Sequence, residues 1–257
     1  MPRSTGATMK DDMMVQRQVM TDASAPAPAA RPIALSVFDL DRTLTILPTY
    51  TPFLLFAACT RAPWRFLLAP LLIPAALLYA LKLIPRRTMK PLMHRLMIGG
   101  TLARAEVQKL ADSFADRLIE NGIYADGRAL IAAERAAGRR VILATAAPHF
   151  YAATIAQRLG IDDVVATASR WRGDLLLPEL GGTNCYGEDK LRMLRAFMDG
   201  AGIDRAAAHI RFYSDHASDL PMFEFADEAF AVNPSPKLRS IAAARGWSLL
   251  DWDKGAR

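Results

Sequence analysis

The sequence has no acidic residue between Asp41 and Glu106. Nine lysines and arginines lie within that interval, so one segment of the chain carries a strong positive charge. The rest of the chain holds 23 of the 32 basic residues and all 26 acidic residues, a net charge of −3, although the whole chain carries +6. Such an uneven distribution indicates that this segment meets an anionic partner.

Cysteine is also scarce. Cys59 and Cys185 are the only two, and neither belongs to a C-x-x-C pattern. A disulfide framework and a cysteine-based zinc or redox motif are therefore disfavoured, and a reducing cytoplasmic setting fits better. Residues 1–30 lack the continuous apolar core of a secretory signal, and their Ala/Pro-rich part predicts a flexible tail.

Two aspartates follow the first strongly apolar stretch. The motif FDLDRTLT places Asp39 and Asp41 directly after the run 33–38. Alternate residues of a strand point the same way, so both carboxylates would face one point beyond the strand end. Two anions so close need a cation or a shared proton, as in a metal site or a nucleophile paired with an acid/base. A solvated turn with an N-cap aspartate is the alternative that these residues alone leave open.

Strands alternate with helices from residue 33 onward. This order predicts an α/β fold, a Rossmann-like parallel sheet with helices on both faces. The expected strands cover 33–40, 139–146, 162–169, 209–215 and 228–233, the expected helices 148–160, 188–200, 219–227 and 235–246, and a short hairpin 169–180.

Polar residues gather where these strands end. Ligands of parallel sheets bind at the carboxyl ends of the strands, so we expect acids, a hydroxyl and a lysine to meet at one edge. The residues are Asp39 and Asp41 after the first strand, Thr145 after the second, Asp215 and Asp219 after the fourth, and Lys190 at the start of a helix.

With these motifs in order, the chain resembles the haloacid dehalogenase superfamily of phosphohydrolases. FDLDRTLT matches the D-x-D-x-T motif, ILATAAP the second motif, YGEDK the third, and YSDHASDLPMFEFA the acidic fourth. The resemblance covers about residues 33–252, and the long insert after the first motif is similar to the helical cap of the phosphoserine-phosphatase-like (class IB) branch. It implies a catalytic core at 31–46 and 126–257, with a cap at 47–125.

The resemblance also implies a role for each motif residue. Asp39 would attack phosphorus and become an aspartyl-phosphate, while Asp41 would protonate the leaving oxygen and then activate water. Thr145 would bond a phosphoryl oxygen, and Lys190 would neutralise charge on the nucleophile and the phosphate. Arg42 stands where Gly or Ser is more usual, and its side chain can point to solvent.

Magnesium is the cofactor that the resemblance implies. Asp39, the backbone carbonyl of Asp41, and Asp215 would hold it, and Asp219 would orient the metal and its waters. Hard oxygen ligands of this kind suit Mg²⁺.

The insert carries an apolar run of sixteen uncharged residues, 66–81. A straight membrane span needs ~20 residues, and Pro70 and Pro74 would kink this one. Basic residues flank both ends, with Trp64 and Tyr79 near the edges, which favours a re-entrant or interface-lying hairpin at an anionic membrane surface. A helical bundle buried in a soluble cap is the alternative.

The insert resembles that of phosphatidylglycerophosphatase C relatives, which implies a lipid phosphomonoester as substrate and a peripheral position at the inner face of the membrane. Two alternatives stay open. A soluble phosphoserine phosphatase would hold its substrate's amino group with an acid soon after the first motif, and TLTILPTYTPF has none. A membrane adaptor without turnover would not need the complete motif set. Nothing resembles a nucleic-acid module.

Overall fold

The computed structural model describes residues 32–71, 73–74, 77–78, 81, 83 and 86–252. The predicted tail, residues 1–30, therefore lies outside the described residues, as does Tyr79.

Six strands form one sheet in which every neighbouring pair is parallel. The order across the sheet is β4-β3-β1-β7-β8-β9, so the chain builds outward on one side of β1 and then on the other. This is the doubly wound Rossmann-like arrangement, whose switch point lies beside the first strand. The strands are β1 (Ile33–Phe38), β3 (Arg140–Pro148), β4 (Asp163–Thr167), β7 (Ala208–Ser214), β8 (Glu228–Val232) and β9 (Ser248–Leu250).

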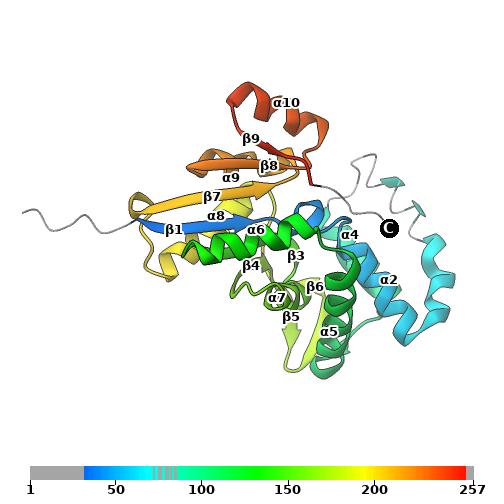
Figure 1. The fold of residues 1–257 in the computed structure, drawn as a ribbon. Coiled ribbons are helices and arrows are strands. Elements are labelled where there is room, and N and C mark those ends of the chain that lie inside the picture. The colour runs from blue at the N-terminus through cyan, green and yellow to red at the C-terminus, as the bar shows by residue number, and fades with distance from the viewer. Residues whose placement is uncertain are drawn as a thin grey trace, which may run out of the picture. The chain divides into compact units, whose positions relative to one another are not determined.

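Helices cover both faces of this sheet, as the sequence predicted (Figure 1). Alternation along β1 decides the faces: Leu35 and Val37 belong to one apolar cluster, and Phe38 belongs to the other. The first cluster is completed by α8 (Glu188–Gly200), α9 (Leu220–Phe225) and α10 (Pro236–Arg245), the second by α6 (Ala125–Ala136) and α7 (His149–Arg158).

The insert after the first motif is helical. Its elements are α2 (Tyr50–Arg61), the 3₁₀ helix η2 (Pro63–Leu71), α4 (Arg86–Met97) and α5 (Arg104–Asn121). An aromatic cluster joins it to the core: Phe53 of α2 stacks on Tyr151 of α7, with ring centroids 4.7 Å apart, and Phe114 of α5 meets both rings edge-on. The insert is thereby packed against the core helix that follows Thr145.

The two segments that connect the insert to the core are bound to each other. The amide of Ile46 donates to the carbonyl of Gly122 at 2.9 Å, and the amide of Tyr124 donates to the carbonyl of Leu44 at 3.0 Å. An isolated antiparallel bridge between Thr45 and Ile123 lies between these bonds. The chain thus leaves and rejoins the core through a two-stranded clasp.

The predicted hairpin at 169–180 forms as β5 (Ser169–Arg172) and β6 (Leu175–Leu180). The sequence did not predict its partner, the two-residue strand β2 (Leu102–Ala103), which pairs antiparallel with β6 and makes a second, three-stranded sheet. The hairpin therefore joins the insert rather than the main sheet.

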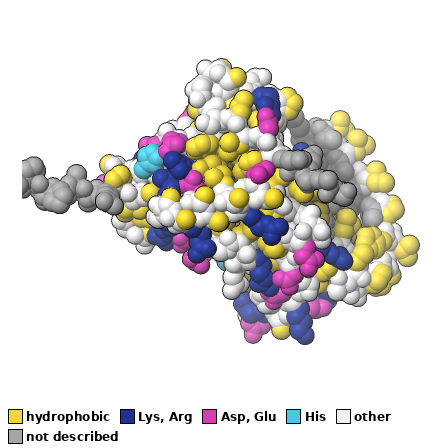
Figure 2. Space-filling model, in the orientation of Figure 1, with side chains coloured by type: hydrophobic (Ala, Val, Ile, Leu, Met, Phe, Trp, Pro, Cys, Tyr) yellow, Lys and Arg dark blue, Asp and Glu magenta, His cyan; other side chains and the backbone are white. Residues whose placement is uncertain are grey.

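The apolar run of the insert contains no membrane-crossing helix among the residues that the structure describes. Its first part is η2, which includes Pro70. Figure 2 shows hydrophobic side chains at the outer edge of the insert, on the right of the view. Between residues 64 and 83, the large exposed apolar residues are Trp64, Leu67, Leu71, Ile73, Leu77, Leu78, Leu81 and Leu83.

Candidate active site

A cavity of about 280 Å³ opens at the carboxyl ends of β1 and β7, beside the switch point of the sheet. Parallel sheets bind ligands at this place because the chain runs to opposite sides there and leaves a crevice. Five of the six predicted site residues line the cavity: Asp39, Asp41, Lys190, Asp215 and Asp219.

Lys190, on the first turn of α8, links two of these carboxylates. Its Nζ donates to Oδ1 of Asp39 at 2.8 Å and to Oδ2 of Asp219 at 2.6 Å. All three side chains are buried, with 2%, 7% and 3% of Lys190, Asp39 and Asp219 exposed. A buried charge is stable only when it is paired, so the lysine and the two acids hold one another in place.

Two hydroxyls that were not among the predicted site residues complete the cluster. Thr43 Oγ1 donates to Oδ2 of Asp39 at 3.2 Å and accepts from the amide of Asp215 at 3.0 Å. Ser214 Oγ donates to Oδ2 of Asp219 at 2.8 Å. Thr43 thereby ties the end of β1 to the end of β7. Thr43 is the threonine of the D-x-D-x-T motif, and that motif was the sequence signal from which its role could have been predicted.

Asp41 lies on the turn η1 (Leu40–Leu44), which carries the chain from β1 toward the insert. Its Oδ1 accepts from the amide of Thr49 at 2.8 Å and from Thr49 Oγ1 at 2.7 Å. Next to it, Arg42 is exposed and has a φ of 63°. This left-handed conformation explains why a glycine is suited to the position, and Arg42 itself lines the cavity.

Burial changes the proton affinity of the acids. It raises the pKa of Asp39 to about 6, with Lys190 opposing the rise and the charges of Asp219 and Asp41 adding to it. Burial likewise raises the pKa of Asp215 to about 7, reinforced by Asp39 and Asp219. Burial alone would lower the pKa of Lys190, but the carboxylates of Asp219 and Asp39 raise it above its ordinary value, so the lysine stays protonated.

The donor set fits magnesium. Asp219 Oδ1 is a buried oxygen without a hydrogen-bond partner among the described residues. Burial and the neighbouring carboxylates raise the pKa values of Asp39 and Asp215, and a bound cation would offset this crowding of negative charge. No three His, Cys, Asp or Glu side chains within the described part of the chain converge as a metal cluster. The predicted magnesium site needs only two carboxylate ligands and the Asp41 carbonyl, because water and substrate fill the remaining positions around Mg²⁺.

Thr145 is the predicted residue that does not line the cavity. It is wholly buried, and its Oγ1 accepts from the amide of Ala147 at 3.1 Å. Its neighbour Ala146 forms the cavity wall instead. The O–H of Thr145 can still donate, so its expected phosphoryl contact stays a prediction that requires a local shift.

The comparison with protein families settles the membership of the chain. Residues 36–224 match the haloacid dehalogenase-like hydrolase family. The chain belongs to this family. The match includes Asp39, Asp41, Lys190 and Asp215, so the cavity is formed by the family's own domain.

Similar proteins of the hydrolase family include phosphoserine phosphatase SerB1 of Mycobacterium tuberculosis, 34% identical over 150 residues, which are 58% of this chain and 47% of that protein. The chain thus spans about half the length of the first curated relatives it matches. A solved Bordetella pertussis protein with unknown function superposes with a TM-score of 0.77 and 27% identity, covering 86% of this chain and 99% of that one. A probable phosphoserine phosphatase from Vibrio cholerae shares the fold, with a TM-score of 0.61, 13% identity, and 86% and 62% of the two chains covered.

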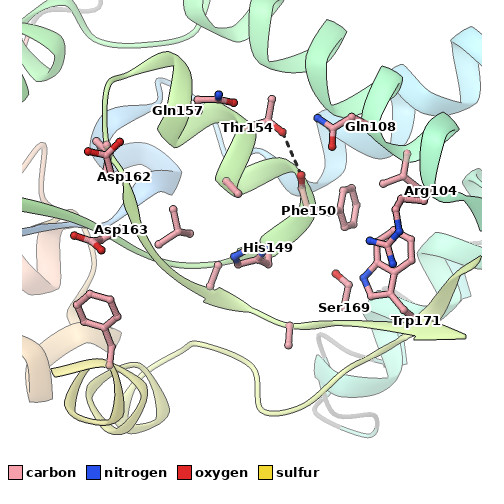
Figure 3. Close-up of a pocket in the computed structure, with 17 residues that line it drawn as sticks. Arg104, Gln108, His149, Phe150, Thr154, Gln157, Asp162, Asp163, Ser169 and Trp171 are labelled. Atoms are coloured by element: carbon pink, nitrogen blue, oxygen red, sulfur yellow. Dashed lines mark hydrogen bonds between the residues drawn. The ribbon is translucent and has the colours of Figure 1, made fainter. Parts of the chain in front are cut away.

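A larger hollow of about 950 Å³ lies elsewhere in the protein, between α5, α7 and the hairpin (Figure 3). None of the six predicted site residues lines it, but His149 does, together with Phe150 and Trp171. His149 is the first residue of α7 and is exposed. We take the smaller cavity as the candidate active site because it holds the acids and the lysine.

Proposed function

We propose that the protein is a magnesium-dependent phosphomonoester hydrolase that works through an aspartyl-phosphate intermediate. The observation that supports it best is the Asp39 carboxylate, bound by Lys190 at 2.8 Å, with Asp41 on the wall of the same cavity. Family membership and the phosphatase names among the relatives point to the same chemistry.

The proposed reaction uses the chain's own groups in two steps. Asp39 attacks phosphorus, the bond from phosphorus to the leaving oxygen breaks, and Asp41 gives that oxygen a proton. In the second step Asp41 takes a proton from water, the water attacks phosphorus, and Asp39 is released with inorganic phosphate. Lys190 offsets the negative charge on Asp39 and on the phosphoryl oxygens, and Thr145 donates to one of these oxygens. When bound, magnesium would be held by Asp39, Asp215 and the Asp41 carbonyl, and would offset the remaining charge.

The test is turnover of a phosphomonoester panel with Mg²⁺ and with chelator. Wild-type protein should release phosphate from p-nitrophenyl phosphate only with Mg²⁺, and Asp39→Asn should abolish this while it keeps the circular dichroism and melting temperature of the parent. Phosphate release by Asp39→Asn near the parent rate would exclude Asp39 as the nucleophile. If wild-type protein turns over no ester, the result would favour the alternative of a membrane adaptor without catalytic activity.

We further propose that the substrate is a lipid phosphate, reached from the inner face of an anionic membrane. The support is the row of exposed apolar residues on the insert, among them Leu67 at 81% and Ile73 at 69% exposed. An apolar surface with few charges can enter the boundary of a bilayer without a spanning helix. The interval 42–105, which includes the exposed apolar residues, has no acidic residue that would repel anionic headgroups.

The basic residues support this proposal less than the sequence alone suggested. Arg61 forms an ion pair with Glu106, and Arg95 one with Glu179. Lys90 points inward and donates to the carbonyl of Ala146 at 2.8 Å and to Asn184 Oδ1 at 2.7 Å. The side chains of Arg86 and Arg87 lie outside the described residues. Apolar contact should therefore carry most of the membrane binding.

The vesicle test follows from this. Wild-type protein should bind vesicles of mixed phosphatidylglycerol and phosphatidylcholine, with a component that resists high salt. The double variant Leu67→Gln, Ile73→Gln should lose that component and lose turnover of a vesicle-borne lipid phosphate, but keep turnover of p-nitrophenyl phosphate. Leu249→Gln, a matched exposed residue on β9 that is 40% exposed, should change neither.

Phosphoserine is the second candidate substrate, because a relative named phosphoserine phosphatase is 34% identical over 150 residues. The same panel decides between the two. A kcat/KM for phosphoserine above that for lipid phosphates in detergent, in protein that ignores vesicles, would replace the lipid proposal and leave the phosphatase proposal intact.

A further inference from the structure

Three side chains from separate parts of the chain form a hydrogen-bonded row that ends at Asp41. Thr49 Oγ1 donates to Asp41 Oδ1 at 2.7 Å, and Tyr151 Oη lies 3.1 Å from the same Thr49 Oγ1. Asp41 lies on the turn after β1, Thr49 directly precedes α2 of the insert, and Tyr151 is on α7 of the core. The row thus connects the cavity wall, the insert and a core helix.

The direction of these bonds follows from counting protons. A hydroxyl has one hydrogen to donate, and Oδ1 of Asp41 accepts whether the group is ionised or carries its proton on Oδ2. Thr49 uses its hydrogen on Asp41 at 2.7 Å, so the bond between the two hydroxyls must be donated by Tyr151. Burial raises the pKa of Tyr151 well above its usual range, which keeps this proton on the phenol.

Tyr151 is held more firmly than a typical tyrosine. Its side chain is wholly buried, with its ring stacked on Phe53 at 4.7 Å and met edge-on by Phe114 and Phe150. A phenol at a fixed place imposes one orientation on the hydroxyl that it donates to, and Thr49, 1% exposed, is itself buried.

The row leaves the two oxygens of Asp41 unequal. Oδ1 accepts from both the amide and the hydroxyl of Thr49, whereas Oδ2 has no hydrogen bond among the described residues. A carboxyl group whose Oδ1 is engaged by two donors carries its proton on the other oxygen.

We propose that Thr49 and Tyr151 are positioning residues that orient Asp41, so that Oδ2 presents its proton to the leaving oxygen. This rests on the proposed function, in which Asp41 is the general acid. The insert then takes part in placing the acid, because Thr49, directly before its helix α2, orients Asp41, and Tyr151 ties Thr49 to the core.

Leaving-group dependence separates positioning from a general effect on stability. Proton donation matters more when the departing oxygen is more basic, so a badly placed acid slows phenyl phosphate more than p-nitrophenyl phosphate. The experiment measures kcat/KM for both esters at saturating Mg²⁺, with vanadate inhibition as a readout of the phosphate pocket alone.

Thr49→Val should lower the ratio of phenyl to p-nitrophenyl phosphate turnover by about tenfold, since the amide of Thr49 still holds Asp41 and only the hydroxyl is lost. Vanadate inhibition should stay within about twofold of the parent if the phosphate pocket is intact.

Matched variants complete the experiment. Thr49→Ser should restore the ratio, and Tyr151→Phe should shift it in the same direction by a smaller factor. Thr60→Val removes a hydroxyl that donates within α2, and Tyr50→Phe removes a phenol that donates to the Lys90 carbonyl, so neither should shift the ratio. If Thr49→Val does not fold, Tyr151→Phe decides the question.

Equal losses on both esters in Thr49→Val, or an unchanged ratio in folded Thr49→Val and Tyr151→Phe, would overturn the positioning role. The proposed function would still stand if wild-type protein turns over the esters and Asp39→Asn does not. Wild-type protein with no turnover of either ester would overturn both.

Discussion

The Nζ atom of Lys190 lies 2.8 Å from Oδ1 of Asp39, although 151 residues separate the two in the chain. Their pairing depends on the sheet, because β1 delivers the aspartate and α8 the lysine to the same crevice. Asp219 approaches the same ammonium at 2.6 Å. One cation therefore serves two buried acids, and the cluster remains short of positive charge.

Lys190→Met should lower kcat/KM for p-nitrophenyl phosphate by about 100-fold or more, because the charge on Asp39 and on the transferring phosphoryl group loses its fixed partner. Steady-state kinetics with Mg²⁺ measures this. Lys237→Met on α10, an exposed lysine, is the control and should match the parent. Activity in Lys190→Met within a factor of about three of the parent would contradict the role of the lysine.

Asp215→Asn should weaken magnesium use more than substrate capture, because one charged oxygen of the donor set is lost. We expect the Mg²⁺ concentration for half-maximal activity to rise by about tenfold or more, with partial recovery of turnover at high Mg²⁺. A Mg²⁺ titration of activity measures this, with the exposed Asp199→Asn as the control. An unchanged Mg²⁺ titration would show that Asp215 is not a ligand.

Magnesium should bind more tightly as the pH rises from about 5 to about 8. In the metal-free protein the pKa of Asp39 is raised to about 6 and that of Asp215 to about 7, so both acids hold protons at the lower end of this window. The metal must displace these protons to bind.

The same shifts fix the sign of the stability change. Both acids bind more protons in the folded than in the unfolded chain, so the stability that these two groups contribute to the metal-free protein is greatest at low pH and is lost as the pH rises through their folded pKa values. The increase in melting temperature on adding Mg²⁺ should be larger at about pH 8 than at about pH 5. Equal increases at the two pH values would count against a metal held by these carboxylates.

Thr43→Val should lower both stability and activity. The change keeps the shape of the side chain but removes its donor to Asp39 and its acceptor for the Asp215 amide, which leaves that buried amide without a partner. We expect a loss of about 1–3 kcal/mol in the free energy of unfolding, measured by urea titration. Thr43→Ser keeps both bonds and should recover most of the loss. A Thr43→Val protein as stable as the parent would mean that water replaces the hydroxyl.

The sequence predicted five of the six strands of the main sheet because each is a mostly apolar stretch and helices alternate with them along the chain. Asp39 after β1 and Asp215 after β7 could be placed at one edge from that pattern alone. The two-residue β2 and the three-residue β9 were not predicted, because strands so short have no periodicity and form only where a partner strand is already in place.

Contacts between distant residues were the harder part of the site. Nothing in the sequence pairs Thr49 with Tyr151, 102 positions away, and their bond follows from the packing of α2 on α7. The inward turn of Lys90 was missed for the same reason: a lysine in an acid-free segment predicts an outward charge, while Ala146 and Asn184 supply its acceptors from elsewhere in the fold.

The clasp between segments 44–46 and 122–124 has a consequence for how such a chain can change over generations. The two ends of the insert are already joined, so lengthening or shortening the loop between them alters the closure entropy of the core only slowly. New material can be exchanged at this place while β1 and α6 keep their positions. The core can therefore retain one chemistry while inserts of different length and composition adapt it to new surroundings.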